Sequence, residues 1–107
     1  MKKTVYKVRH KASGLYYKPS SGCNLSEEGK IYPTKNTVLS MLFSADRKYV
    51  YSTNLYVPRN GKIYKKYKDK LEDCYWLDGD FITASGNDFE LVAFEMETNL
   101  KEIGIVS

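Results

Sequence analysis

The chain of 107 residues is long enough for one hydrophobic core and too short for two, so a single domain over residues 1–107 is expected. Its 42% hydrophobic and 28% charged residues exclude wholesale disorder. No apolar run approaches the ~20 residues that span a bilayer, and the first residues lack the apolar stretch of a secretory signal, so a cytoplasmic protein without membrane contact is expected.

The first part of the chain predicts a β-hairpin. Side-chain character alternates over residues 4–8, which favours a strand, and Gly14 supplies a turn residue that is free to take positive φ. An extended run over 15–18 forms the second strand of this hairpin. A tight turn closed by glycine follows over 24–29, and a short strand is predicted over 30–32.

The middle of the chain carries both helix and strand signals. A short helix is predicted near residues 37–45, where apolar side chains share one face at helical spacing. Residues 48–57 are rich in Tyr, Val and Thr and predict a strand. The Arg-Asn-Gly sequence at 59–61 predicts a hairpin turn that leads into an extended run over 62–64. Residues 65–73 fit either a short helix or a long exposed loop.

The last third predicts further strands. Turn clusters at 78–80 and 85–88 flank the apolar run 81–83, and residues 89–96 then alternate as a strand. A closing strand is predicted over 102–106. The expected fold class is therefore α+β and β-rich, a small antiparallel sheet built from hairpins with one short helix.

The charge is divided along the chain. Residues 1–70 hold sixteen Lys and Arg against four acids, a net charge of +12, whereas residues 71–107 hold one Lys against nine acids, a net charge of −8. A clustered positive field attracts phosphates or an acidic protein. The alternative is that the acidic third packs beside the basic strands and cancels much of the field.

Neither the cysteines nor the acidic turns indicate a catalytic or metal site. Cys23 and Cys74 are read as reduced thiols, and neither is predicted to be a nucleophile, because Cys23 has no evident link to a base and Cys74 has an acidic neighbour. Asp78 and Asp80 open like a calcium loop but lack the later ligands. No phosphate-binding glycine loop occurs, which excludes the usual nucleotide-dependent enzymes. No cofactor, no metal and no enzymatic activity are therefore expected from the cysteines, the acidic turns and the glycines together.

His10 is the single histidine and stands between Arg9 and Lys11. Neighbouring cations lower the pKa of an imidazole, which would leave it neutral as a base. Together with Tyr17 these residue types are those that a metal-free ribonuclease needs. A solvent-facing histidine in a basic strand is the commoner case, so ribonuclease activity ranks last among the functional hypotheses.

Lysine and arginine alternate with tyrosine in several segments. On a sheet surface such rings stack on unpaired bases while the ammonium groups bind phosphates, and the same surface would grip an acidic protein. The alternative is that the tyrosines pair across strands and the lysines keep the sheet soluble. The candidate binding residues are Arg9, His10, Lys11, Tyr16, Tyr17, Lys18, Lys30, Tyr32, Tyr64 and Lys66.

Two segments resemble a group of small proteins encoded by tailed bacteriophages. The first is Arg-His-Lys-Ala-Ser-Gly-Leu-Tyr-Tyr-Lys-Pro at 9–19, and the second is Asn-Leu-Ser-Glu-Glu-Gly-Lys-Ile-Tyr at 24–32. The likeness covers about the first third of the chain, with a weaker match near 89–95. It implies a phage accessory protein that acts inside an infected bacterium, and it carries no catalytic residues over.

The leading hypothesis is therefore a phage-type accessory protein that inhibits or redirects host machinery by stoichiometric binding, with anti-CRISPR or other anti-defence activity as its sharpest form. Its expected partner is a host protein or nucleoprotein complex, and the sequence indicates no oligomeric state. Mimicry of DNA is excluded as a mechanism, because residues 1–70 carry a net positive charge, whereas a DNA mimic needs dense negative charge. The alternative is a module that binds single-stranded RNA or DNA, and a small ribonuclease comes third.

Overall fold

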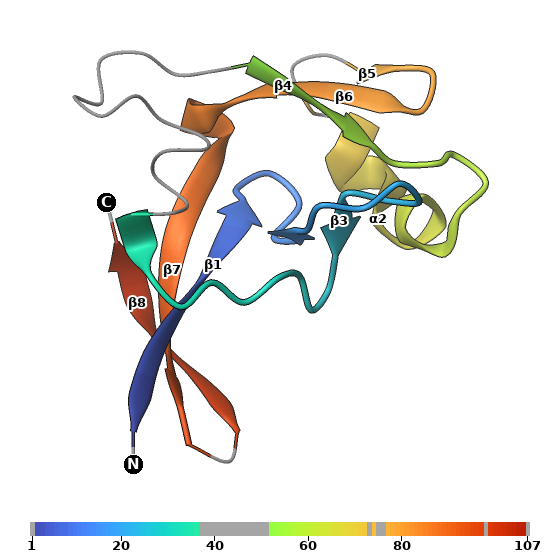
Figure 1. The fold of residues 1–107 in the computed structure, drawn as a ribbon. Helices are drawn as coiled ribbons and strands as arrows, with labels where there is room; N and C mark the ends of the chain where they lie inside the picture. The colour runs from blue at the N-terminus through green and yellow to red at the C-terminus, as the bar shows by residue number, and fades with distance from the viewer. Residues whose placement is uncertain (1, 37–51, 73, 75–76, 98, 107) are drawn as a thin grey trace.

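A computed structural model describes residues 2–36, 52–72, 74, 77–97 and 99–106 (Figure 1). They form a small, strand-rich α+β fold with an antiparallel five-stranded sheet, which confirms the predicted fold class. The helix predicted near 37–45 lies outside the described residues. The elements are β1 (Lys3–His10), β2 (Tyr16–Tyr17), β3 (Leu25–Ser26), β4 (Ser52–Tyr56), α2 (Lys62–Glu72), β5 (Leu77–Asp78), β6 (Phe81–Ser85), η1 (Gly86–Asp88), β7 (Phe89–Met96) and β8 (Leu100–Val106).

The larger sheet has the strand order β3-β2-β1-β7-β8. Strands β1 and β7 pair antiparallel over their whole length, from Lys3 opposite Met96 to His10 opposite Phe89. The hairpin of β1 and β2 confirms the prediction, and Gly14 in its turn has a φ of 74°. Strand β7 has its predicted bounds, and β8 begins two residues before the predicted start. The long-range β1–β7 pairing brings the basic front and the acidic end of the chain together.

The smaller sheet has the order β4-β6-β5. The turn between β5 and β6 contains Gly79 with a φ of 61°, as the turn cluster at 78–80 predicts. The second turn cluster forms the short 3-10 helix η1, where the chain changes direction sharply between β6 and β7 (Figure 1). The smaller sheet is thereby placed across one end of the larger one.

The predicted hairpin at 59–61 is wrong. Helix α2 begins at Lys62, and the backbone N–H of Lys65 donates to the Gly61 carbonyl at 3.1 Å, so Gly61 starts a helix where a second strand was expected. Of the two alternatives for residues 65–73, a short helix or a long exposed loop, the structure has the helix, which ends at Glu72. Apolar residues on this segment recur at helical spacing, with Tyr64 and Leu71 buried. Tertiary burial of that stripe outweighs the local preference of an Asn-Gly pair for a hairpin turn.

The main core lies between one face of the larger sheet, the β4–β6 pair and α2. Val8, Leu25, Leu55, Leu71 and Ile82 are each 1% exposed or less in this cluster. A smaller cluster on the opposite face of β1 and β7 contains Val5, Val92 and Phe94. Both faces of the central strands are therefore buried, which explains why the alternation along β7 is interrupted by four consecutive buried apolar residues at 91–94. No helix among the described residues has the length and hydropathy that a bilayer span requires.

The segment between β2 and the described end at residue 36 differs from expectation in one respect. The strand predicted over 30–32 is a single bridge, in which Tyr6 and Tyr32 exchange two backbone hydrogen bonds of 2.8 Å. The turn predicted over 24–29 contains β3 and ends at Gly29, with a φ of 70°. The Tyr32 ring is buried, and burial raises the pKa of its hydroxyl.

Candidate functional site

Three of the ten candidate binding residues are buried in the core. His10 and Tyr32 are each 2% exposed and Tyr64 is 7% exposed. The expectation that these side chains stand on an exposed face is wrong, because each lies on the side of its element that packs against the core. Lys11, Lys30 and Lys66 are exposed, and Arg9, Tyr16, Tyr17 and Lys18 are half-buried. The structure therefore does not gather the ten residues on one surface.

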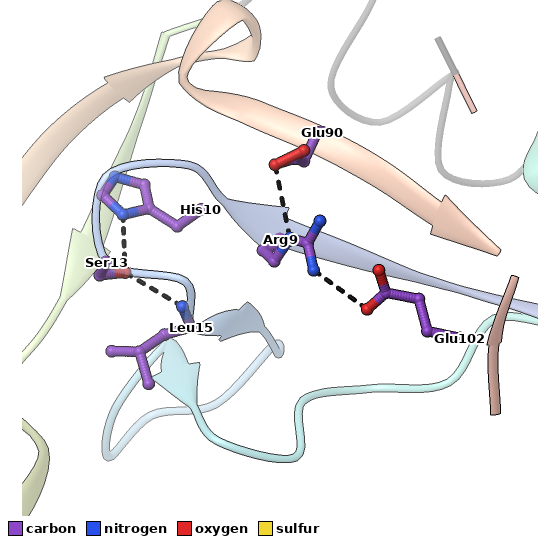
Figure 2. A network of polar contacts seen from close by, with 6 residues as sticks. All are labelled: Arg9, His10, Ser13, Leu15, Glu90 and Glu102. Atoms are coloured by element: carbon purple, nitrogen blue, oxygen red, sulfur yellow. Dashed lines mark hydrogen bonds and ion pairs between the residues drawn. The ribbon is translucent and has the colours of Figure 1, made fainter. Parts of the chain in front are cut away.

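Arg9 is neutralised by carboxylates from the acidic end of the chain. Its Nε donates to Glu90 at 3.4 Å and its Nη1 donates to Glu102 at 3.1 Å (Figure 2). Burial alone would lower the pKa of the guanidinium, but hydrogen bonds to Glu90 and Tyr16 and the charges of Glu90 and Glu102 together outweigh that effect, so the pKa is raised. Lys2 makes a further ion pair with Glu95. Carboxylates of β7 and β8 thus partly cancel the positive charge of β1. This is the alternative stated for the charge division, in which the acidic third packs beside the basic strands.

Lys7 lies on the same face of β1 as Arg9 and is buried. Its Nζ stands 4.9 Å from the centroid of the Tyr16 ring and 5.1 Å from that of Phe94, a cation–π arrangement. Burial lowers the pKa of this ammonium, against a smaller raising effect of Glu28. Lys7 is therefore held inside the sheet and adds little to an exposed positive surface.

The tyrosines of β2 do not present free stacking planes. The Tyr16 ring meets Phe94 edge to face at 5.9 Å between centroids, and the Tyr17 ring meets Phe89 in the same way at 6.3 Å. Both tyrosines are half-buried, and Tyr17 packs against the main core. These contacts fit the structural interpretation of the tyrosines better than the predicted role in stacking on bases.

Helix α2 is the described element with the most exposed lysines. All five of its lysines are exposed, and the helix contains only two acidic residues. Lys66 pairs with Glu27 and Lys68 pairs with Glu72. In the described part of the chain, Lys62, Lys65 and Lys70 take part in no ion pair. We define these three residues as the α2 lysine surface.

A partly exposed aromatic pair lies on the neighbouring strands β4 and β6. Phe81 is 47% exposed, and its ring centroid lies 5.3 Å from that of Tyr56 on the neighbouring strand. The backbone N–H of Arg59 donates to Asp80 Oδ1 at 2.9 Å, and the Arg59 side chain donates to the carbonyl of Gly79. Arg59, three residues ahead of α2, is thereby fixed to the two residues that directly precede Phe81. Aromatic and arginine side chains are the residue types enriched at the centres of binding surfaces.

A second feature surrounds the buried His10. Its Nδ1 lies 2.9 Å from Ser13 Oγ (Figure 2), and its Nε2 lies 3.9 Å from the Sγ of Cys74. Ser13 Oγ also accepts the backbone N–H of Leu15 at 3.2 Å, which fixes the hydroxyl in place. Desolvation by burial lowers the pKa of His10, partly offset by the charge of Asp88. The imidazole is therefore neutral at pH 7 and can accept a proton.

The lowered pKa of His10 predicts a loss of stability in mild acid. The unfolded chain takes up a proton near pH 6.5, whereas the folded chain does so only at lower pH, so acid favours unfolding. Between pH 7 and the folded pKa, the free energy of unfolding should fall by at most ~1.4 kcal/mol per pH unit. Urea unfolding at several pH values measures this slope. His10→Gln should flatten it, and an equally steep slope in that variant would contradict the assignment.

No family model, curated protein or solved structure matches the chain. Among the residues that the structure describes, no cluster of three or more His, Cys, Asp or Glu side chains could hold a metal ion.

The sequence interpretation missed Cys74 as a partner of His10. Sixty-four positions separate the two residues, and no spacing rule connects them. By contrast, the alternation of side chains along β1 already implies that Arg9 and His10 point to opposite faces, as Figure 2 shows. The four residues of the ribonuclease hypothesis, which include Lys11 and Tyr17, are therefore not brought together on one face.

Proposed function

We propose that the protein is a phage-type accessory protein that binds an anionic host protein or nucleoprotein complex one to one, through α2. The observation that carries the proposal is the distribution of ion pairs. Carboxylates of the acidic end pair with Lys2, just ahead of β1, and with Arg9 on β1, whereas the α2 lysine surface makes no ion pair with described residues. Lys3, Lys11, Lys30, Lys35 and Lys101 are also exposed and make no ion pair with described residues, but they lie on separate segments, whereas α2 carries three such lysines on one short element.

The aromatic pair on β4 and β6 supports binding rather than a purely solubilising role for these lysines. A large exposed ring, whose two preceding residues hold an arginine, supplies the apolar anchor that a lysine cluster lacks. Lysines on the rim of such an anchor speed encounter with an acidic partner and set its orientation. Inhibition of host machinery, anti-CRISPR or other anti-defence activity included, would follow from occupation of a site on that partner.

The test is capture of a partner from bacterial lysate with the tagged protein, with and without nuclease. The complex should have one copy of each component by light scattering, and the captured amount should fall steeply as salt rises from about 50 mM to about 200 mM. Recovery of no specific partner, or of one whose binding ignores salt, would contradict the proposal.

Single-stranded nucleic acid is a second candidate, favoured by the exposure of Phe81. A ring that is 47% exposed can stack on an unpaired base, which the packed rings of Tyr16 and Tyr17 are less able to do. Fluorescence anisotropy with a labelled single-stranded oligonucleotide tests this candidate. Phe81→Ala should weaken binding by about tenfold or more, whereas Tyr17→Ala should not act through stacking. Nuclease-resistant capture in the lysate experiment favours the protein partner instead.

A further inference from the structure

A pocket of about 350 Å³ lies beside His10, at a place that the proposed binding function does not use. It is formed where the end of β1 and the residue Cys74 meet β6 and η1. The lining residues are His10, Lys11, Ala12, Cys74, Ile82, Thr83, Asn87 and Asp88. A buried imidazole and a half-buried thiol thus share one cavity that is large enough for a small molecule.

The thiol and the imidazole are arranged for proton transfer. Cys74 Sγ lies 3.9 Å from His10 Nε2 and 3.7 Å from the carbonyl oxygen of Lys70, both within hydrogen-bonding distance for sulfur, and of these two acceptors only the imidazole can take up the proton. The opposite ring nitrogen of His10 is held by Ser13 at 2.9 Å, and the edge of the ring rests on Phe89 at 5.5 Å between centroids. A base that is itself oriented by a third group is the pattern that activates a cysteine nucleophile.

We propose that Cys74 is a thiol-modification site that reacts with a small disulfide, with His10 as the general base. The Sγ of Cys74 attacks one sulfur of the disulfide while its proton passes to His10 Nε2. A new S–S bond forms to Cys74, the original S–S bond breaks, and the departing thiolate takes the proton from His10. Cys74 is oxidised to a mixed disulfide, and the departing half is reduced to a thiol.

The charges around the pocket are compatible with this chemistry. Desolvation keeps His10 neutral and ready to accept the thiol proton. Lys11 and Asp88 are the charged residues that line the pocket, and the backbone N–H of Lys11 donates to the Asp88 carbonyl at 2.9 Å.

Two single-cysteine variants isolate the reaction. Cys23→Ser leaves Cys74 as the reporting thiol, and Cys74→Ser leaves Cys23, which is also half-buried and whose Sγ lies 3.1 Å from the Leu25 carbonyl. The probes are dithionitrobenzoate, followed by absorbance, and oxidised glutathione, followed by mass. At pH 7 Cys74 should react at least about tenfold faster than Cys23 with both disulfides. Equal rates would overturn the proposal.

The pH profile of Cys74 in the Cys23→Ser protein provides a test that needs no change at the site. A thiol without a base loses about tenfold in rate per pH unit below its ordinary pKa near 8.5. With neutral His10 as base, the rate should fall much less between pH 8 and pH 6.5. A tenfold loss per unit over that range would reject the role of His10.

Variants of the general base, His10, and of the residue that positions it, Ser13, complete the test. His10→Asn should slow Cys74 at pH 7 by about tenfold or more and restore the steep pH profile of an unassisted thiol. Ser13→Ala should give a smaller loss, since the ring keeps its contact with Phe89. Circular dichroism establishes that each variant is folded. A folded His10→Asn protein with unchanged rate and pH profile would overturn the proposal, whereas partner binding through α2 is unaffected by either result.

Discussion

Gly29→Ala should destabilise the protein by about 3 kcal/mol or more, the sum of a left-handed backbone conformation and a steric overlap. Gly29 has a φ of 70°, and a Cβ added there would overlap with the Cβ of Tyr16, which lies on the sheet and has little room to move. This glycine lets the turn after β3 pack directly on β2. The same turn carries Glu27, which forms an ion pair with Lys66 of α2.

Gly14→Ala is the matched control for this prediction. Gly14 has nearly the same φ, 74°, but an added Cβ would meet no atom within 4 Å. Its replacement should therefore cost only the conformational term, about 1 kcal/mol. Urea unfolding of both variants measures the difference. Equal losses for the two variants would show that the close approach of Gly29 to Tyr16 contributes nothing.

Reversal of two charges on α2, Lys62→Glu with Lys65→Glu, should weaken partner binding by at least about tenfold. The change removes two exposed cations from the α2 lysine surface and replaces them with anions that repel an acidic partner. Neither residue is buried or takes part in an ion pair of the described chain, so stability should change little. Titration of the captured partner against the variant measures the effect.

The matched control reverses the same amount of charge elsewhere. Lys3 on β1 and Lys101 on β8 are exposed and lie at the end of the five-stranded sheet away from α2 (Figure 1). Lys3→Glu with Lys101→Glu should change affinity by less than about threefold, through the net charge alone. Equal weakening by the two double variants would mean that net charge, and not α2, governs binding.

The strands that the sequence predicts well have strong local signals. Residues 89–96 alternate over a full strand, and the turn at Gly14 is set by one residue with positive φ. The segment after Gly61 was predicted wrongly because an Asn-Gly pair is a strong hairpin signal. The apolar spacing of Tyr64, Tyr67 and Leu71 already fits a helix and could have corrected it.

The candidate site was less predictable, because it depends on contacts between distant segments. The pairing of Arg9 with Glu90 follows from the register of β1 with β7, which no local pattern specifies. The burial of Tyr32 likewise depends on a single bridge to Tyr6. Side-chain alternation gives the two faces of β1, but it cannot tell which face is covered. The proximity of His10 and Cys74 is likewise a contact between distant segments, which no local pattern predicts.

The most direct test of the central claim is the reactivity of each lysine towards a small acylating reagent, with and without the captured partner. Mass spectrometry reads the modification of every lysine in one experiment. The account predicts that the partner protects the α2 lysine surface and leaves Lys3 and Lys101 reactive. Protection of Lys3 and Lys101, with the lysines of α2 still reactive in the complex, would contradict it.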